Sequence, residues 1–140
     1  MLIRMIYVSS AVGPVTTAVT GTILRSAQAY NTAHGITGVL CQGQGAYLQV
    51  LEGERSKLEA LYTRILADRR HQNIALRQSQ DITRRRYGKW SMAHVDLAQA
   101  DAQMAATLPD FDPNTRAGEQ VMVTLDSLIA AGTVLNAPVV

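Results

Sequence analysis

The chain has 140 residues, of which 47% are hydrophobic and 17% are charged, and its formal net charge is +2 at pH 7. At this length and composition we expect one globular domain with its own core, and a disordered tail is excluded. The small charge argues against the broad cationic face that binds nucleic acid. The locally basic run Arg84-Arg85-Arg86 has two readings, a solvated loop or an anion-binding patch.

The cysteine count and the N-terminal sequence indicate in which cellular compartment the protein is expected. Cys41 is the only cysteine, so no internal disulfide can form, and the sequence has no CxxC motif or His/Cys cluster that would bind a metal. The first residues, MLIRMIYVSS, are apolar but interrupted by Arg4, and the run is too short for a secretory signal or a membrane span. We therefore expect a cytoplasmic protein with no membrane contact and no metal site.

A strand and a helix open the chain. Residues 2–8 alternate, so that Tyr7 shares one face of the predicted strand with Ile3 and Met5. Residues 16–30 then place apolar side chains at helical spacing, although a glycine and several threonines lower the intrinsic helix propensity. This helix therefore needs packing against the rest of the fold.

A β-hairpin follows the first helix. Residues 36–42 and 46–52 are apolar runs, and Gly43 and Gly45 between them can supply the positive φ angles of a tight turn. The second run contains a primary amide, Gln49. Leaving part of such an amide unsatisfied in a core costs on the order of 1–3 kcal/mol, so a polar group should face it.

A second helix and two further strands come next. Residues 55–67 carry the apolar stripe of an amphipathic helix. Residues 73–82 predict a strand, and WSMAHV, residues 90–95, predicts a short alternating strand. The alternation places Trp90 and Met92 on the same face of this last strand.

The remainder of the chain is helical in character. Residues 97–108 and 119–133 predict helices, separated by the turn DFDPNT. The middle strands are apolar on both faces and therefore need cover on both sides. We predict an α+β, ferredoxin-like βαββαββ sandwich with two helices on one sheet face and the C-terminal extension on the other. Residues 1–96 form the domain, and residues 97–140 form an extension of the same unit.

No Ser/His/Asp constellation, phosphate loop or carboxylate pair stands out, so we do not expect an enzyme. Polar residues on the face toward the first two helices are more informative: Tyr7, Gln49 and Asn31 at the end of the first helix. Each has a simpler interpretation. Tyr7 could be a core tyrosine with one hydrogen bond, and Asn31 could be a helix cap.

Taken together, the residues from 1 to 96 resemble the BLUF domain, a family of blue-light sensors that use flavin. The resemblance depends on the spacing of five residues in their motifs: Tyr7 in LIRMIYVSS, Asn31 in NTAHGITGVL, Gln49 in YLQVLEG, and Trp90 with Met92 in KWSMAHV. The short C-terminal extension is similar to that of the small stand-alone photoreceptors, rather than to members fused to cyclase or phosphodiesterase domains.

The resemblance implies a flavin held without a covalent bond between the two helices, above the sheet. FAD is the expected cofactor, and FMN or riboflavin could occupy the same pocket. The family's flavin contacts correspond to Tyr7, Ile23, Asn31, Gln49, Arg64, Ile65, Asp68 and His71. Without the family, Arg64 and Asp68 would be an ordinary surface ion pair and His71 a loop histidine.

The family mechanism implies that the photoexcited flavin takes an electron and a proton from Tyr7. Their return leaves Gln49 with a changed hydrogen-bond arrangement, which an amide can adopt because it has both donors and an acceptor. Trp90 and Met92 would complete the switch and move the C-terminal helices. From the residues alone, these two side chains are core, and Cys41 is packing.

The expected signal acts on an unidentified downstream protein, and we expect a homo-oligomer. The alanine-rich extension and the apolar end VLNAPVV could pack on the sheet or on another subunit. Two other functions remain open. One is a flavin-free regulatory or oligomerisation module of the same fold. The other is an acylphosphatase-like enzyme, although SSAVGPV, after the first strand, lacks the arginine that would hold phosphate.

Overall fold

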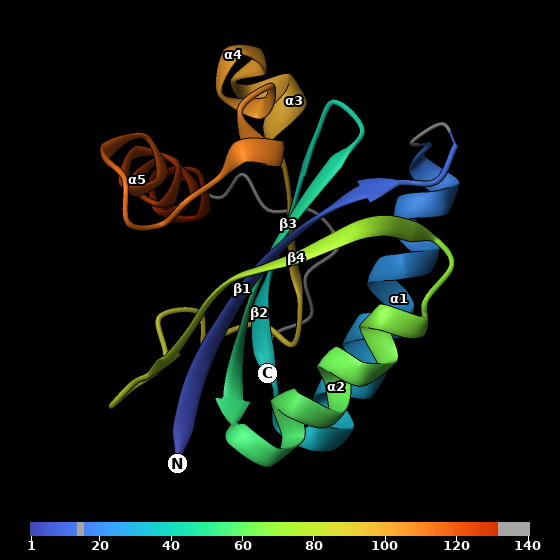
Figure 1. The fold of residues 1–140 in the computed structure, drawn as a ribbon, viewed down its shortest axis with the longest axis vertical. Helices are drawn as coiled ribbons and strands as arrows, with labels where there is room; N and C mark the ends of the chain where they lie inside the picture. Colours follow the sequence, from blue (N-terminus) through green and yellow to red (C-terminus); the bar gives the residue numbers. More distant parts are fainter. Residues whose placement is uncertain (14–15, 132–140) are drawn as a thin grey trace.

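A computed structural model describes residues 1–13 and 16–131 of the chain (Figure 1). Within these residues, five strands form one sheet in the order β4-β1-β3-β2-β5. The first four strands pair antiparallel with their neighbours, and β5 adds to β2 in parallel. The strands are β1 (Leu2–Ala11), β2 (Thr37–Gly43), β3 (Ala46–Glu54), β4 (His71–Asp81) and β5 (Ala93–Asp96). This is the predicted α+β, ferredoxin-like sheet.

Strand β1 lies between β4 and β3, and its register with β3 places Tyr7 opposite Gln49. Ile3, Met5 and Tyr7 are buried on one face of the sheet, as the alternation predicts. The intervening apolar residues of β1 pack into a separate core on the other face. The two faces of the central strands are thus both covered.

Helices α1 (Thr17–His34) and α2 (Arg55–Ala67) cover the first of these faces (Figure 1). The first helix is longer than predicted. Asn31 lies inside its last turn, and the left-handed cap is Gly35, whose φ is 66°. The interpretation of Asn31 as a cap is therefore wrong, because only the glycine adopts the positive φ that ends the helix.

The C-terminal extension covers the other face (Figure 1). It comprises α3 (Leu97–Ala100), α4 (Ala102–Ala105), the 3₁₀ turn η1 (Leu108–Asp110) and α5 (Arg116–Ala130). The single helix predicted over 97–108 is wrong, because Asp101 has a non-helical backbone (φ −156°, ψ 88°) and its side chain caps α4 by accepting from the Met104 N–H at 3.0 Å. The last helix begins earlier than predicted, where Thr115 caps it, and the end VLNAPVV lies outside the described residues.

The hairpin turn uses its glycines differently from the prediction. The two residues with positive φ are Gln44 (47°) and Gly45 (85°), not Gly43. Gly43 is needed for a different reason. A Cβ at this position would lie 2.9 Å from the Ala105 Cβ, so its small size allows the extension to pack closely on β2.

The predicted strand over 90–95 is shorter in the structure, and its side chains do not simply alternate. Regular pairing with β2 begins at Ala93. Before it the chain bends, and Trp90 packs against the core beneath the extension, whereas Met92 is buried against α1 and α2. The prediction that Trp90 and Met92 share the cofactor-side face is therefore wrong for Trp90.

The basic run lies in the loop between β4 and β5 and is bonded to β3. Glu52 is fully buried, and its carboxylate accepts from Arg4 at 2.8 and 3.0 Å and from the N–H groups of Arg86 (2.9 Å) and Tyr87 (2.7 Å). Arg85 donates to three oxygens, which belong to the cap of α1 (Gly35), the start of β2 (Thr37) and the end of β3 (Glu52). Two of the three arginines in the run are thus structural, so a merely solvated loop is an incomplete description.

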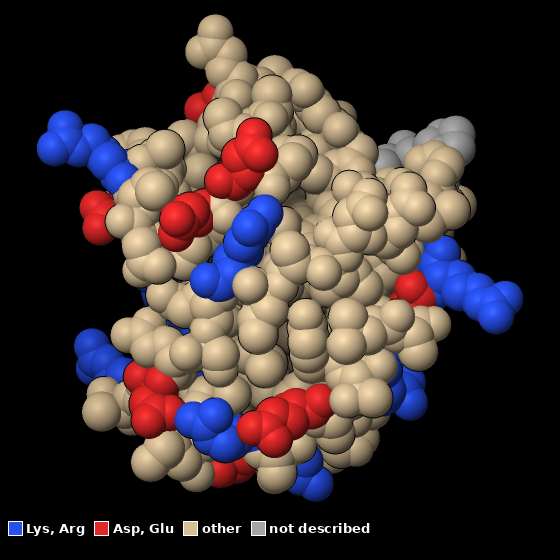
Figure 2. Space-filling view, viewed as in Figure 1, with Lys and Arg blue, Asp and Glu red and all other residues tan. Residues whose placement is uncertain are grey.

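The same loop also contacts the extension. Arg86 forms an ion pair with Asp126 of α5, and the Tyr87 hydroxyl donates to the same carboxylate at 2.7 Å. On the face shown in Figure 2, positive and negative side chains are interspersed. No helix among the described residues is long and apolar enough to cross a membrane.

Candidate functional site

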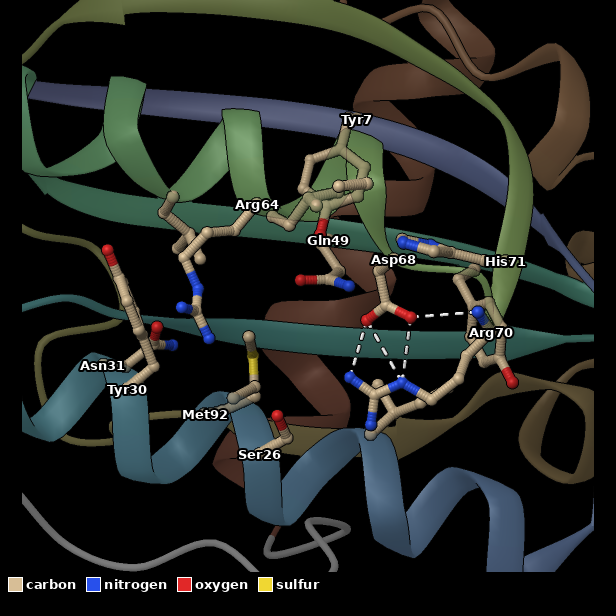
Figure 3. A pocket seen from close by; sticks show the side chains of 16 residues that line it. Tyr7, Ser26, Tyr30, Asn31, Gln49, Arg64, Asp68, Arg70, His71 and Met92 are labelled. Carbon is tan, nitrogen blue, oxygen red and sulfur yellow. Dashed lines mark hydrogen bonds and ion pairs between the residues drawn. The ribbon is translucent and has the colours of Figure 1, made fainter.

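A cavity of about 380 Å³ lies between α1, α2 and the sheet (Figure 3). This volume is within the range of sites for small organic ligands. Strands β1 and β3 form its floor, and the two helices form its walls. The lining residues are Tyr7, Ile23, Ser26, Ala27, Tyr30, Asn31, Tyr47, Gln49, Leu61, Arg64, Ile65, Ala67, Asp68, Arg70, His71 and Met92.

The floor of the cavity is built around Tyr7 and Gln49. Their strands pair so that the two residues are opposite each other, and the Tyr7 hydroxyl points toward the Gln49 amide (Figure 3). Both are buried, with 0% and 6% of their surface exposed. Burial raises the pKa of the Tyr7 hydroxyl well above its ordinary value, and the Gln49 amide partly offsets this effect. Tyr7 is therefore a neutral hydroxyl at physiological pH.

Four buried polar atoms that belong to lining residues have no hydrogen-bond partner in the described part of the chain. They are Tyr7 Oη, Asn31 Oδ1, Tyr47 Oη and His71 Nε2. Each such atom costs about 1–3 kcal/mol when it stays unpaired. Native folds pair almost all buried polar atoms, so four exceptions around one cavity indicate a polar ligand with both donors and acceptors.

Asn31 connects the cavity to the segment before β5. Its Nδ2 donates to the Ser91 carbonyl at 2.7 Å, while its Oδ1 is one of the unpaired atoms. One turn earlier on α1, Gln28 Nε2 donates to the Met92 carbonyl at 3.1 Å. The first helix thus holds two successive carbonyls of this segment and fixes the position from which the Met92 side chain enters the cavity.

The other end of the cavity holds Asp68, Arg70 and His71 (Figure 3). The Asp68–Arg70 pair is bidentate, with its shortest contact at 2.6 Å, and its hydrogen bonds lower the pKa of Asp68. His71 Nδ1 lies 2.9 Å from Ser9 Oγ, and burial lowers the pKa of the imidazole. A neutral imidazole and a charged pair therefore lie side by side.

Arg64 is at the opposite end of the cavity, near Tyr30 and Asn31 (Figure 3). Its guanidinium lies over the Tyr30 ring, 4.4 Å from the centroid. The interpretation of Arg64 and Asp68 as a surface ion pair is wrong, because Asp68 pairs with Arg70 instead. Arg64 therefore keeps its hydrogen-bond donors at the mouth of the cavity.

The structure brings together every residue that the family resemblance marked as a flavin contact, since all eight line this one cavity. Of the two switch residues near β5, Met92 lines it and Trp90 does not. The sequence reasoning missed Ser26, Tyr47 and Arg70. Tyr47 could have been found, because it is two residues before Gln49 and so shares its face of the strand. Ser26 is three residues after Ile23 on the same helix face.

A flavin ring fits the chemistry of this cavity. The isoalloxazine system is planar and largely apolar on its faces, and Ile23, Leu61, Ile65 and Met92 offer apolar contacts. Its pyrimidine edge carries carbonyl acceptors and an N–H donor. The unpaired atoms of the lining, which include hydroxyls, an amide oxygen and an imidazole nitrogen, provide the complementary groups.

Comparisons with known sequences show which proteins this chain is similar to. A family profile described as BLUF, sensors of blue-light using FAD, matches residues 2–93. Photoactivated adenylate cyclase subunit alpha of Euglena gracilis is 33% identical over 108 residues, which is 77% of this chain and 10% of that protein. The chain thus spans about a tenth of the length of this curated relative.

Solved structures show the same similarity. The dark-state structure of BlrB, a BLUF protein, is 29% identical and superposes with a TM-score of 0.77, covering 94% of this chain and 96% of that one. A bacterial light-regulated adenylyl cyclase is also 29% identical, with a TM-score of 0.70 over 94% of this chain and 36% of that one. At this coverage the similarity includes part of the C-terminal extension.

Proposed function

The chain belongs to the BLUF family of flavin-binding blue-light sensors, and from this premise we propose that the cavity between α1, α2 and β1/β3 is where it holds the flavin ring. The observation that carries the proposal is the set of four unpaired polar atoms around this cavity. A noncovalent ligand would satisfy them. The proposed cofactor contacts are Tyr7, Ile23, Asn31, Gln49, Arg64, Ile65, Asp68 and His71.

We assign FAD as the cofactor, and FMN or riboflavin would use the same ring contacts. Asn31 Oδ1 and His71 Nε2 come from the two ends of the cavity, so they can hold the ring edge and the chain attached to it. The Asp68–Arg70 pair supplies charged donors beside His71. Arg70 could therefore meet a phosphate group if the bound flavin has one.

Tyr7 is the proposed photochemical donor. When bound, an excited flavin supplies a strong one-electron oxidant and a proton acceptor. The Tyr7 hydroxyl holds its proton in the dark, because burial raises its pKa. It has no hydrogen-bond partner among the described residues and points toward Gln49, so its proton can leave toward the amide and return along the same path.

Gln49 is the proposed moving part. Its amide has two donors and an acceptor, so a half-turn or tautomerisation exchanges them without any shift of β3. A rearranged hydrogen bond is worth about 1 kcal/mol, whereas converting one populated state almost fully into another takes about 5 kcal/mol. The amide must therefore act on a structural element whose two positions already have nearly equal free energies.

The segment before β5 is that element in our proposal. Asn31 and Gln28 of α1 bind the Ser91 and Met92 carbonyls. Strand β2 adds one backbone bond, from the Gly38 N–H to the Trp90 carbonyl at 3.1 Å, and its regular ladder with β5 begins only at Ala93. Met92 contacts the cavity, and Trp90 contacts the core under the extension. We assign both to the switch, with a displacement of Met92 passed through Trp90 to the extension.

The output of this switch is conformational, and we assign no catalytic reaction to the domain itself. Residues 1–96 would form the flavin-binding unit, with 97–140 as an extension that carries the signal to a separate downstream protein or to a second copy of the chain. Known relatives are named as light-regulated cyclases, which is consistent with an effector that the sensor controls. The buried, unpaired Cys41 is consistent with a reducing compartment such as the cytoplasm.

Cofactor identification tests this proposal directly. The purified protein should carry one flavin per chain, and heat release followed by chromatography should identify it as FAD, FMN or riboflavin. Substituting Asn31→Ala should lower the flavin content, because it removes an unpaired acceptor in the cavity. A matched control is Asn114→Ala, in a turn of the extension. A chain that binds no flavin even after reconstitution would contradict the assignment and favour a flavin-free module.

A further inference from the structure

Arg64, one of the proposed flavin contacts, belongs to a stack of three side chains at the mouth of the cavity, and the other two, Tyr30 and His34, have no assigned role. The Arg64 guanidinium lies 4.4 Å from the centroid of the Tyr30 ring. The Tyr30 ring is in turn stacked on the His34 ring, with centroids 4.0 Å apart and planes inclined by 19°. The order of the stack is therefore Arg64, Tyr30, His34, and it joins α2 to the last turn of α1.

The aromatic half of this stack is fixed by the helix that carries it. Tyr30 and His34 are four residues apart on α1 and so lie one above the other. His34 Nδ1 lies 2.8 Å from the Tyr30 carbonyl, and Gly35 ends the helix immediately afterwards. The Tyr30 ring thus has a backing surface that keeps it facing α2.

Arg64, the cation of this stack, has no competing ion-pair partner among the described residues. Within the described residues, Arg64 forms no ion pair or hydrogen bond, and the nearby carboxylate of Asp68 is bound to Arg70. The Arg64 side chain is exposed and would otherwise be free to move through solvent. A cation over an aromatic ring is stabilised by about 0.5–1 kcal/mol at an exposed site, and by more when water is excluded.

We propose that Tyr30 is a positioning residue that, supported by His34, holds Arg64 over the mouth of the cavity, and that this Arg64–Tyr30 contact retains the flavin. Both side chains line the cavity and come from different helices, so separating them widens its mouth between α1 and α2. The inference rests on the proposed function, because it concerns retention of the flavin in that same cavity.

The rate of flavin release tests the contact. Free flavin is more fluorescent than bound flavin, so dilution of the loaded protein gives the rate from the rise in emission. The substitution Tyr30→Leu should speed release about two- to fivefold, the equivalent of one exposed cation–π contact. The control Tyr30→Phe keeps the ring and should release flavin at nearly the wild-type rate. Equal rates for wild type and Tyr30→Leu would overturn the proposal.

A double-mutant cycle separates positioning from a general structural effect. In an Arg64→Met background, Tyr30→Leu should cause little further acceleration, because the contact is already absent. Independent, multiplying effects of the two substitutions would overturn the role given to Tyr30. Thermal unfolding of the flavin-free variants verifies that each is folded. A wild-type chain that takes up no flavin would overturn the proposed function itself, whereas a loaded chain with unchanged release overturns this contact alone.

Discussion

Strand β3 carries two buried polar side chains, Gln49 and Glu52, whose surroundings differ in one respect. The Glu52 carboxylate, on the face toward the extension, accepts four hydrogen bonds from the chain itself. Gln49, on the face toward α1 and α2, lines a cavity in which four buried polar atoms lack partners. Two positions of β3 that are only three residues apart in sequence thus belong to a saturated polar site, with all its partners, and to an unsaturated one, which lacks them.

The difference distinguishes buried polar groups that stabilise the fold from buried polar groups that are available to a ligand. A buried carboxylate with all its partners ties together segments that are distant in sequence, here β1, β3 and the β4–β5 loop. Unpaired buried atoms destabilise the fold instead, because each lowers the stability of the flavin-free chain by about 1–3 kcal/mol until a ligand binds. We therefore expect substitutions at the first site to affect folding and substitutions at the second to affect the response to light.

The largest effect on stability should come from Glu52. Substituting Glu52→Ala leaves Arg4 and two backbone N–H groups without their acceptor, and breaking a buried ion pair in this way costs about 3–5 kcal/mol. Urea unfolding of the flavin-free protein measures the loss. The control Glu54→Ala removes an exposed carboxylate paired with the N-terminus and should cost under about 1 kcal/mol. Similar losses of unfolding free energy for the two variants would contradict the structural role given to the buried Glu52 carboxylate.

A smaller effect, of opposite sign, is expected at the cavity. The substitution Tyr7→Phe removes an unpaired buried hydroxyl, so the flavin-free chain should become more stable by about 1 kcal/mol. Urea unfolding of the two flavin-free proteins gives the change. In the loaded protein the same substitution should abolish the light response while keeping the flavin. A marked loss of stability would show that Tyr7 has a partner within the protein.

Acidification should weaken the fold through two buried histidines. Burial lowers the pKa of His71 and of His94, and the Nε2 atom of each is unpaired. The unfolded chain therefore binds more protons near the ordinary histidine pKa of about 6.5, so stability falls as the pH drops through that value. The urea midpoint should be lower at pH 5.5 than at pH 7.5. A midpoint that rises on acidification would contradict the neutral, buried state of these rings.

The smallest effect is expected at the outer edge of the Glu52 site. Asp126 accepts from Arg86 and from Tyr87, but its side chain is 39% exposed. Substituting Asp126→Asn should cost under about 1 kcal/mol, because water competes for such pairs. Urea unfolding again provides the value. A loss as large as that of Glu52→Ala would mean that the saturated site extends out to α5.

Much of the fold follows from local patterns in the sequence. The alternation in β1 correctly placed Tyr7 on one face with Ile3 and Met5, because the period of 2 fixes the faces of a strand. The turn of the β2–β3 hairpin was harder to predict. Gln44 adopts a positive φ while Gly43 does not, since Gly43 is required by contact with Ala105, which is 62 residues away. Such tertiary reasons are invisible in a local pattern.

The candidate site was predicted less completely than the fold. Trp90 was placed on the wrong face because the alternation assumed an unbroken strand, whereas the chain bends at Ser91 and Met92 and β5 begins only at Ala93. Asp101 breaks a predicted helix for a similar reason, by capping the next one. The pairing of Asp68 with Arg70 instead of Arg64 depends on the loop after α2, whose path the spacing of charges does not determine.

The light-minus-dark absorption spectrum of the loaded protein, measured for the wild type and for Gln49→Leu, tests the central claim most directly. Blue light should shift the flavin bands of the wild type slightly to longer wavelength, and the shift should reverse in the dark. The leucine variant should bind flavin and show no shift, because it has no amide to rearrange. A full, reversible shift in Gln49→Leu would contradict the claim that the unsaturated face of β3 is where light is sensed.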